Sequence, residues 1–105
     1  MNTIERDYRV LEAIKKNPGA TQRELAIALG ISVGKVNYCL KALIEKGWIK
    51  AGNFKRSNNK LGYLYLLTPI GIEEKTKLTK AYLQRKIAEY ERIKTEIEQL
   101  QQHTD

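Results

Sequence analysis

Two helical patterns joined by a tight turn constrain the fold of this chain more than any other feature. Thr21 and Glu24 have the spacing of a capping box, which predicts a helix start, and the apolar residues after them end at Gly30. Glycine is favoured in the left-handed conformation that follows a helix end. Ser32 is suited to cap a second, longer helix that ends near Lys46. A short helix, a tight turn and a longer helix are the layout of a helix-turn-helix motif.

Further elements flank this motif on both sides. Apolar residues at helical spacing predict a helix over residues 3–16. The short runs 48–51 and 63–68 are rich in aromatic and apolar residues and predict two strands. The polar segment 53–60 between them is expected to form the tip of a hairpin, or wing. Elements in this order predict a winged helix-turn-helix domain.

The last third of the chain predicts one long helix. Thr68 is suited to cap it, and Pro69 is suited to its first helical position. From residue 83 onward apolar residues recur in a heptad pattern that is typical of a coiled coil. The expected dimerisation residues are Leu83, Ile87, Tyr90, Ile93, Ile97 and Leu100. A homodimer is the simplest way to cover this seam. The alternative is that the helix folds back over its own domain.

Together these patterns predict a mainly α fold with a small β-hairpin. The expected architecture is a winged helix-turn-helix domain over residues 1–68 and a long C-terminal coiled-coil helix, used for dimerisation, over residues 69–105. Lys86 and Tyr90 fall at core positions of the coiled coil, so both parallel and antiparallel pairing stay open.

Positive charge is concentrated in the predicted winged domain. The 105-residue chain has 19 Lys and Arg against 12 Asp and Glu, a net charge of +7. Residues 1–70 hold 12 of the basic and 5 of the acidic side chains, whereas residues 71–105 hold 7 of each. The whole excess belongs to the first part, which indicates a polyanionic partner, and a helix-turn-helix motif indicates double-stranded DNA.

The scarcity of reactive residues argues against most enzyme chemistry. Cys39 is the one cysteine and His103 the one histidine, so no catalytic triad, Cys–His pair or His/Cys metal site is expected. We expect a protein that is not an enzyme and has no cofactor, with Cys39 as a packing thiol. The sequence shows neither a targeting segment nor a run of about 20 apolar residues, so we expect a cytoplasmic protein without membrane association.

The second helix of the motif, about residues 32–46, is expected to lie in the DNA major groove. Its expected buried stripe is Val36, Leu40, Leu43 and Ile44. The wing, about residues 53–60, is expected at the minor groove, where a negative potential favours Arg56. The candidate DNA-contacting residues are Thr21, Gln22, Arg23, Ser32, Val33, Lys35, Asn37, Tyr38, Lys41, Lys55, Arg56 and Lys60.

Side-chain chemistry assigns the residues of this helix different roles. Lys35 is suited to the acceptors of guanine, Asn37 to a bidentate contact with adenine, and Val33 to a thymine methyl group. Tyr38 and Lys41 are better placed for the phosphate backbone. In plainer interpretations the lysines are solvated surface charges and Tyr38 packs against the domain.

Three runs resemble the DNA-binding lobe of MarR-type transcriptional regulators. They are TQRELAIALGIS from Thr21, LIEKGWI from Leu43 and LLTPIGI from Leu66. The chain looks most similar to the short, exopolysaccharide-associated regulators of this family. The resemblance implies a homodimer that binds an inverted-repeat site and usually represses. It also implies DNA contacts from Ser32, Lys35, Asn37 and Tyr38 on the recognition helix and from Arg56 on the wing.

Two questions stay open at this point. Members of the family usually have further terminal helices that form a dimer lobe, often with a pocket for small aromatic ligands, whereas this sequence predicts one C-terminal rod. A small-molecule effector is therefore neither predicted nor excluded. The alternative function is a winged-helix module for protein–protein interaction with weak, nonspecific DNA binding, and the charge distribution favours the DNA-binding regulator.

Overall fold

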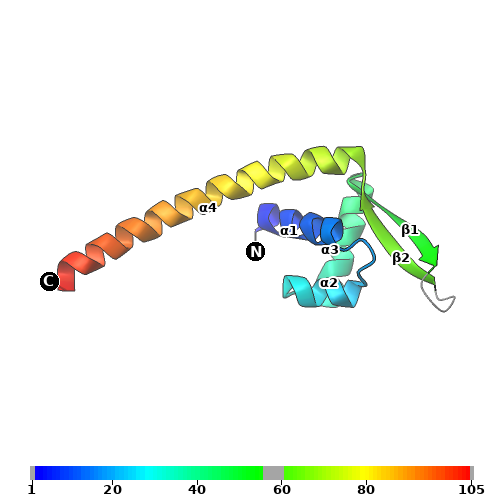
Figure 1. Cartoon of the computed structure of the whole chain (residues 1–105), viewed down its shortest axis with the longest axis horizontal. Helices are drawn as coiled ribbons and strands as arrows, with labels where there is room; N and C mark the ends of the chain where they lie inside the picture. Colours follow the sequence, from blue (N-terminus) through cyan, green and yellow to red (C-terminus); the bar gives the residue numbers. More distant parts are fainter. Residues whose placement is uncertain (1, 56–60, 105) are drawn as a thin grey trace.

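The computed structural model describes residues 2–55 and 61–104, with side chains described for residues 2–52 and 64–104. Three helices, a two-stranded hairpin and one long helix follow one another along the chain (Figure 1). They are α1 (Thr3–Lys16), α2 (Gln22–Leu29), α3 (Val33–Glu45), β1 (Ile49–Lys55), β2 (Leu61–Leu67) and α4 (Pro69–Thr104). The predicted fold class, mainly α with a small β-hairpin, is confirmed.

Local capping residues set the ends of α2 and α3. The Thr21 hydroxyl accepts from the Glu24 backbone N–H at 3.0 Å, and the Glu24 carboxylate accepts from the Thr21 N–H, which completes the predicted capping box. Gly30 ends α2 with a φ of 68°, a left-handed conformation that costs glycine little. The Ser32 hydroxyl accepts from the Lys35 N–H at 3.1 Å and caps α3.

A small apolar core joins α1, α2, α3 and the base of the hairpin. Its largest fully buried side chains are Leu11, Ile14, Leu25, Leu40, Leu43 and Ile49. Burial of each such side chain contributes about 1.5–3 kcal/mol relative to exposure in water. This core holds α3 against α1 and α2 and thereby fixes the direction of the motif's second helix.

The buried stripe of α3 differs from the prediction at one position. Val36, Leu40 and Leu43 are buried as expected, but Ile44 is 40% exposed. Cys39 takes the fourth place and is 2% exposed. Positions 36, 39, 40 and 43 span about 100° of the helix circumference, whereas position 44 lies about 40° beyond Leu40, at the edge of the buried side. The prediction for Ile44 was therefore wrong.

The hairpin is longer than the sequence pattern indicated. Its strands pair antiparallel from Ile49 opposite Leu67 to Lys55 opposite Leu61. Residues 52–55 and 61–62 were expected outside the strands, so the strand ends were placed wrongly. The ladder is made by backbone groups, which lets polar residues extend it beyond its apolar base.

The first third of α4 packs on the lobe formed by α1–α3 and the hairpin. The Thr68 hydroxyl caps α4 by accepting from the Gly71 N–H at 3.0 Å. Tyr82 stacks on Tyr8 of α1 with 4.9 Å between the ring centroids, and its hydroxyl donates to the Glu5 carboxylate at 3.3 Å. Lys75 forms an ion pair of 2.7 Å with Glu12. These contacts fix the direction in which α4 leaves the lobe.

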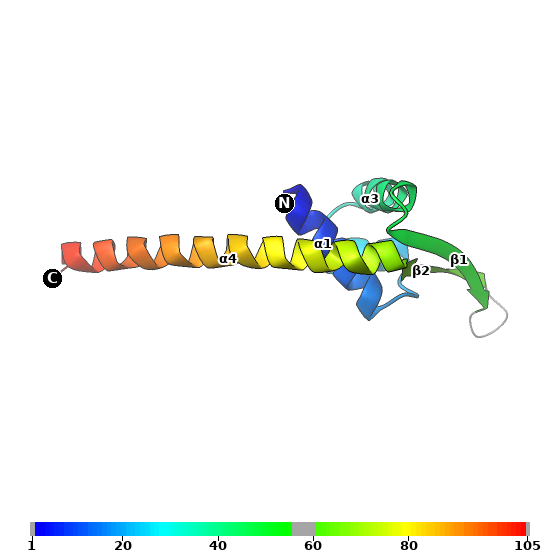
Figure 2. The same cartoon turned by 90° about the horizontal axis from the view of Figure 1, so that it is seen from above.

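The rest of α4 extends away from the lobe as a rod (Figure 2). The chain measures 67 Å along its longest axis, and its radius of gyration is 18.1 Å. A compact domain of this length would have a radius of gyration of about 13 Å. The long, exposed helix matches the predicted rod, and the division into residues 1–68 and 69–105 stays a prediction.

Candidate DNA interface

The N-terminal half of α3 lies on the surface of the lobe. Ser32, Val33, Lys35, Tyr38 and Lys41 are exposed and Asn37 is half-buried. The opposite side of the helix is anchored in the core, so these side chains project from a rigid element. The structure thus places six predicted contact residues on one exposed helix, as a protein that reads a DNA groove requires.

The start of α2 lies beside α3 and contributes to the same surface. The Asn37 side-chain amide donates to the Gln22 carbonyl oxygen at 3.4 Å, and the Gln22 amide donates to the Tyr65 hydroxyl at 3.4 Å. Thr21 caps α2, and Arg23 is exposed on its first turn. Gln22 therefore joins the start of α2 to the predicted recognition helix, and Tyr65 connects Gln22 to the hairpin.

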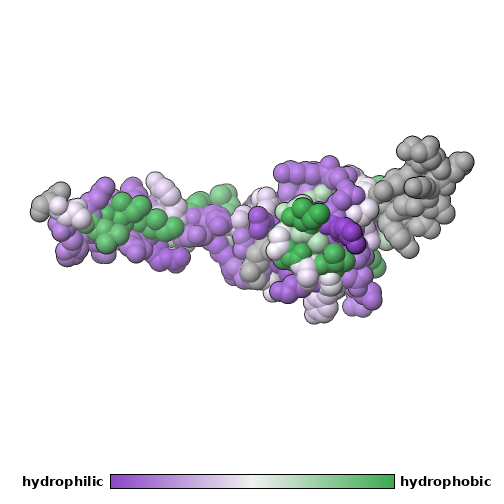
Figure 3. Space-filling view, turned by 90° about the horizontal axis from the view of Figure 1, so that it is seen from below, coloured by the Kyte–Doolittle hydropathy of each residue, from purple (hydrophilic) through white to green (hydrophobic). Residues whose placement is uncertain are grey.

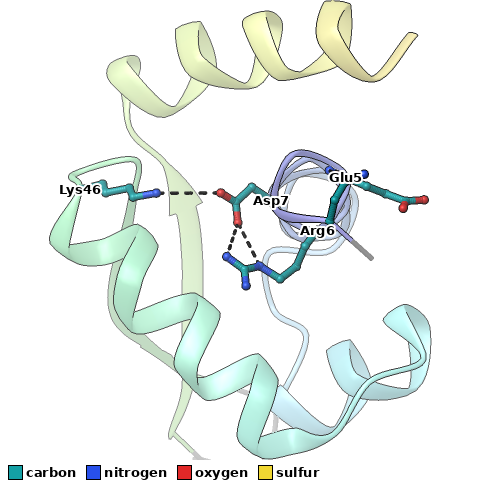
Figure 4. Close-up of polar contacts among 5 residues, drawn as sticks. Glu5, Arg6, Asp7 and Lys46 are labelled. Carbon is teal, nitrogen blue, oxygen red and sulfur yellow. Dashed lines mark hydrogen bonds and ion pairs between the residues drawn. The ribbon is translucent and has the colours of Figure 1, made fainter. Parts of the chain in front are cut away.

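A buried carboxylate attaches α1 to the other end of α3 (Figure 4). Asp7 is 4% exposed, and its Oδ1 accepts from Nε and Nη2 of Arg6, each at 3.4 Å. Its Oδ2 lies 4.0 Å from Nζ of Lys46, which caps α3. Nζ of Lys46 also lies 4.7 Å from the ring centroid of Trp48. The negative charge of Asp7 is thereby compensated between two cations.

Sequence reasoning missed Asp7, although a signal was present. Asp7 precedes Leu11 and Ile14 by four and seven residues, so it lies on the apolar side of α1. A charged residue on such a side indicates a buried ion pair. Its partner Lys46 is far away in the sequence, and no local pattern identifies it.

Cys39 lines a small hollow between α1 and α3. The hollow measures about 190 Å³ and is also lined by Arg6, Ile31, Lys35 and Tyr38. Burial raises the pKa of the Cys39 thiol above its ordinary value of 9.0. The thiol therefore stays protonated at neutral pH, which fits the predicted packing role.

A second, larger groove lies between α1 and α2. It measures about 430 Å³ and is lined by Tyr8, Glu12 and Ala13 on α1 and by Leu25 and Ala28 on α2. The question of a small-molecule effector stays open. In the described parts of the chain, no group of three or more His, Cys, Asp or Glu side chains is arranged to hold a metal ion.

The hairpin projects from the lobe at the end opposite to the tip of α4 (Figure 1). Arg56 and Lys60 lie outside the described residues. Lys55 is the last residue of β1, and its side chain also lies outside the described set. Their contacts with DNA stay predictions.

No single helix among the described residues is long and apolar enough to cross a membrane. Only α2 and α3 taken together pass that test by length and composition, and they are bent by 106° relative to each other. Their apolar residues Leu25, Leu29, Leu40 and Leu43 lie in the core of the lobe.

A helix bundle with an exposed second motif helix and an adjoining hairpin defines a winged helix-turn-helix protein. Residues 5–50 match the family model of winged helix-turn-helix DNA-binding domains. In sequence the chain is 39% identical over 69 residues to the HTH-type transcriptional regulator LrpA of Pyrococcus horikoshii, and equally to that of Pyrococcus abyssi. The match covers 66% of this chain and 48% of each relative, so the chain spans about half the length of these regulators.

Its solved structural neighbours are MarR-family regulators. The S. aureus MepR–DNA complex aligns with a TM-score of 0.62 at 19% identity, covering 100% of this chain and 78% of MepR. A MarR/EmrR family regulator from Acinetobacter aligns with a TM-score of 0.62 at 21% identity, covering 77% of this chain and 56% of that protein. The predicted resemblance to MarR-type regulators is confirmed for the fold. Membership of the exopolysaccharide-associated subgroup stays a prediction.

Proposed function

We propose that this chain is a sequence-specific, dimeric DNA-binding transcription regulator. In this proposal α3 enters the major groove of an inverted-repeat site, the wing contacts the minor groove, and binding represses transcription. The observation that carries it is the exposed N-terminal half of α3 on a lobe that holds the chain's whole excess of positive charge.

The side chains on α3 supply both kinds of contact that DNA recognition needs. Lys35, Asn37 and Val33 provide a cation, an amide and an apolar group for base edges. Tyr38 and Lys41 provide groups that hydrogen-bond phosphates and set the register of the helix. Truncation of Lys35 or Asn37 to alanine should cost about 1–3 kcal/mol of binding and relax specificity at one base pair.

The relatives support the regulatory part of this proposal. The LrpA proteins are named transcriptional regulators. MepR from S. aureus and FabT from Streptococcus pneumoniae have each been solved in complex with DNA. Repression and an inverted-repeat site rest on the resemblance to MarR-type regulators. The dimer rests on the apolar seam of α4.

The salt dependence of duplex binding tests the electrostatic part. If each protomer neutralises about four phosphates, the logarithm of the binding constant should fall with the logarithm of salt concentration with a slope of about −7. Lys41→Ala should make this slope shallower by about one for each phosphate that the variant no longer neutralises. Lys80→Ala, which removes the same charge from an exposed position on α4, is the matched control and should leave the slope unchanged.

The alternative function is a protein–protein interaction module with weak, nonspecific DNA binding. The exposed apolar residues of distal α4 are the observation in its favour. A duplex affinity that is weak at low salt and equal for all sequences would support this alternative and contradict the regulator.

A further inference from the structure

The distal part of α4 carries an apolar stripe that no other described part of the chain covers. Its residues are each between 45% and 61% exposed: Leu83, Ile87, Tyr90, Ile93, Ile97 and Leu100. Figure 3 shows apolar surface along this part of the rod. The stripe borders a groove of about 310 Å³ that is flanked by Lys94 and Glu98. An apolar surface of this length on an isolated helix calls for a partner helix.

We propose that the stripe binds the same stripe of a second copy in a parallel, in-register coiled coil. Both winged domains then lie at the same end of the paired rods, side by side. The inference rests on the dimeric part of the proposed function and adds the orientation of the two chains, which the core residues alone leave open.

The charges that flank the seam favour the parallel orientation. Leu83, Tyr90 and Ile97 occupy core position a of successive heptads, which places Glu89 at position g and Lys94 at position e. In a parallel coiled coil, a g residue faces the e residue five positions later on the other helix. Glu89 therefore faces Lys94 of the second copy, and two-fold symmetry forms this pair twice.

The antiparallel orientation brings like charges together. It places g residues opposite g residues, and Glu96 occupies the g position that follows Glu89. When the two stripes overlap fully in this orientation, Glu89 comes beside Glu96 of the second copy, again twice. Repulsion between these carboxylates opposes antiparallel pairing.

Lys86 is compatible with the parallel arrangement. It occupies core position d at the end of the seam near the lobe, and its Nζ lies 3.3 Å from the Glu89 carboxylate on the same helix. In the parallel dimer the two Lys86 side chains meet in one layer, and each keeps its own counter-charge. A polar residue at one core position specifies register at a cost in stability.

The lobe leaves the stripe accessible to a second rod. The lobe contacts α4 through Lys75, Leu78 and Tyr82. With about 100° per residue, Leu83 and Ile87 lie about 80–180° around the helix from those three residues, and the rest of the stripe lies further along the rod. A second copy can therefore cover the stripe without displacing the α1–α4 contact.

Disulfide cross-linking in the full chain tests the orientation. Leu83→Cys, Tyr90→Cys and Ile97→Cys are made singly, and each variant is oxidised at a concentration at which sedimentation gives a dimer. In a parallel, in-register dimer each residue meets its own copy, so all three variants should form covalent dimers. In an antiparallel dimer at most the position nearest the symmetry axis should do so. The unsubstituted chain is the control, because Cys39 is buried.

A charge exchange gives a second readout without new cysteines. At low salt, Lys94→Glu should weaken dimerisation about tenfold. Glu89→Lys should weaken it more, because it also removes the counter-charge of Lys86, and the double variant should recover the part of that loss that comes from the facing charges. Glu91→Lys, which changes a residue outside the e, g and core positions, is the matched control and should leave dimerisation within about twofold of the original.

The outcomes separate this inference from the proposed function. A dimer that cross-links at all three positions supports the parallel coil. A dimer that cross-links at one position, or one in which the double variant recovers nothing, overturns the parallel orientation but leaves a dimeric regulator intact. If the chain sediments as a monomer, or if its stripe binds only a different protein, this inference and the dimeric part of the proposed function are both overturned.

Discussion

The side-chain amide of Asn37 on α3 donates a hydrogen bond of 3.4 Å to the carbonyl oxygen of Gln22 on α2. This bond leaves one acceptor and one N–H of Asn37 unused by Gln22. Adenine presents one donor, N6, and one acceptor, N7, in the major groove, so the remaining groups of Asn37 match it. In the proposed contact with adenine, Gln22 would act as a positioning residue that orients the Asn37 amide.

Gln22→Ala should weaken the preference for adenine at the base pair that faces Asn37. Loss of one orienting hydrogen bond corresponds to about 1 kcal/mol of discrimination. Binding to site variants that carry each of the four bases at that position measures it. Gln22→Glu is the matched variant, because its carboxylate still accepts from Asn37, and it should retain more of the preference. An unchanged preference in Gln22→Ala would show that Gln22 does not orient Asn37.

Gly34→Ala should separate stability from DNA binding. A Cβ at this position would meet only the Ser32 hydroxyl, at 3.9 Å, within the described part of the chain. Alanine should therefore stabilise the fold by about 0.5–1 kcal/mol, measured by denaturant unfolding. If Gly34 approaches the groove wall, the same variant should bind DNA more weakly. A variant that gains stability and keeps its affinity would show that no such close approach occurs.

Gly71→Ala should disrupt the junction between the hairpin and α4. A Cβ on Gly71 would lie 2.7 Å from the carbonyl carbon of Trp48 and closer still to its oxygen. That oxygen also accepts from the Thr68 N–H at 2.9 Å, so it has little freedom to move. We expect a loss of more than about 2 kcal/mol in the free energy of unfolding. Gly52→Ala, where a Cβ meets no described atom within 4 Å, is the control.

The ion pair between Glu12 and Lys75 should make the α1–α4 contact sensitive to acid. The hydrogen bond from Lys75 lowers the pKa of Glu12 below its ordinary value of 4.5. A carboxyl group with a lowered pKa in the folded state stabilises the fold above pH 4.5 and loses this contribution as the pH falls through the folded-state pKa.

Glu12→Gln should therefore cost about 1 kcal/mol of stability at pH 7 and distinctly less at pH 3, measured by denaturant unfolding at both values. Glu73→Gln, at an exposed position on α4, is the control and should show no such difference. An equal cost for Glu12→Gln at both pH values would mean that charge does not contribute to this contact.

The helices of the motif could be predicted from the sequence because their ends depend on local residues. Thr21, Gly30 and Ser32 each act within a few positions along the chain, so their patterns are visible without a fold. The long helix could be predicted for the same reason, from Thr68 and a sustained heptad pattern.

Contacts between distant parts of the chain could not be predicted in this way. The distant partner of Asp7 is Lys46, and the ring that stacks on Tyr8 belongs to Tyr82. Both pairs form only after α1 packs between α3 and α4. The burial of Cys39 in place of Ile44 likewise depends on how α3 is rotated against α1. The apolar periodicity of the sequence predicts which side of α3 is buried only to within about one residue.

Selection of duplexes from random-sequence DNA by the full chain is the decisive test of sequence recognition by α3. We predict one enriched inverted repeat, bound about a thousandfold or more tightly than shuffled DNA at physiological salt. Asn37→Ala should lose about 1–3 kcal/mol of that preference at a single base pair in each half-site. Recovery of no preferred sequence, with equal affinity for selected and shuffled duplexes, would show that α3 does not read DNA.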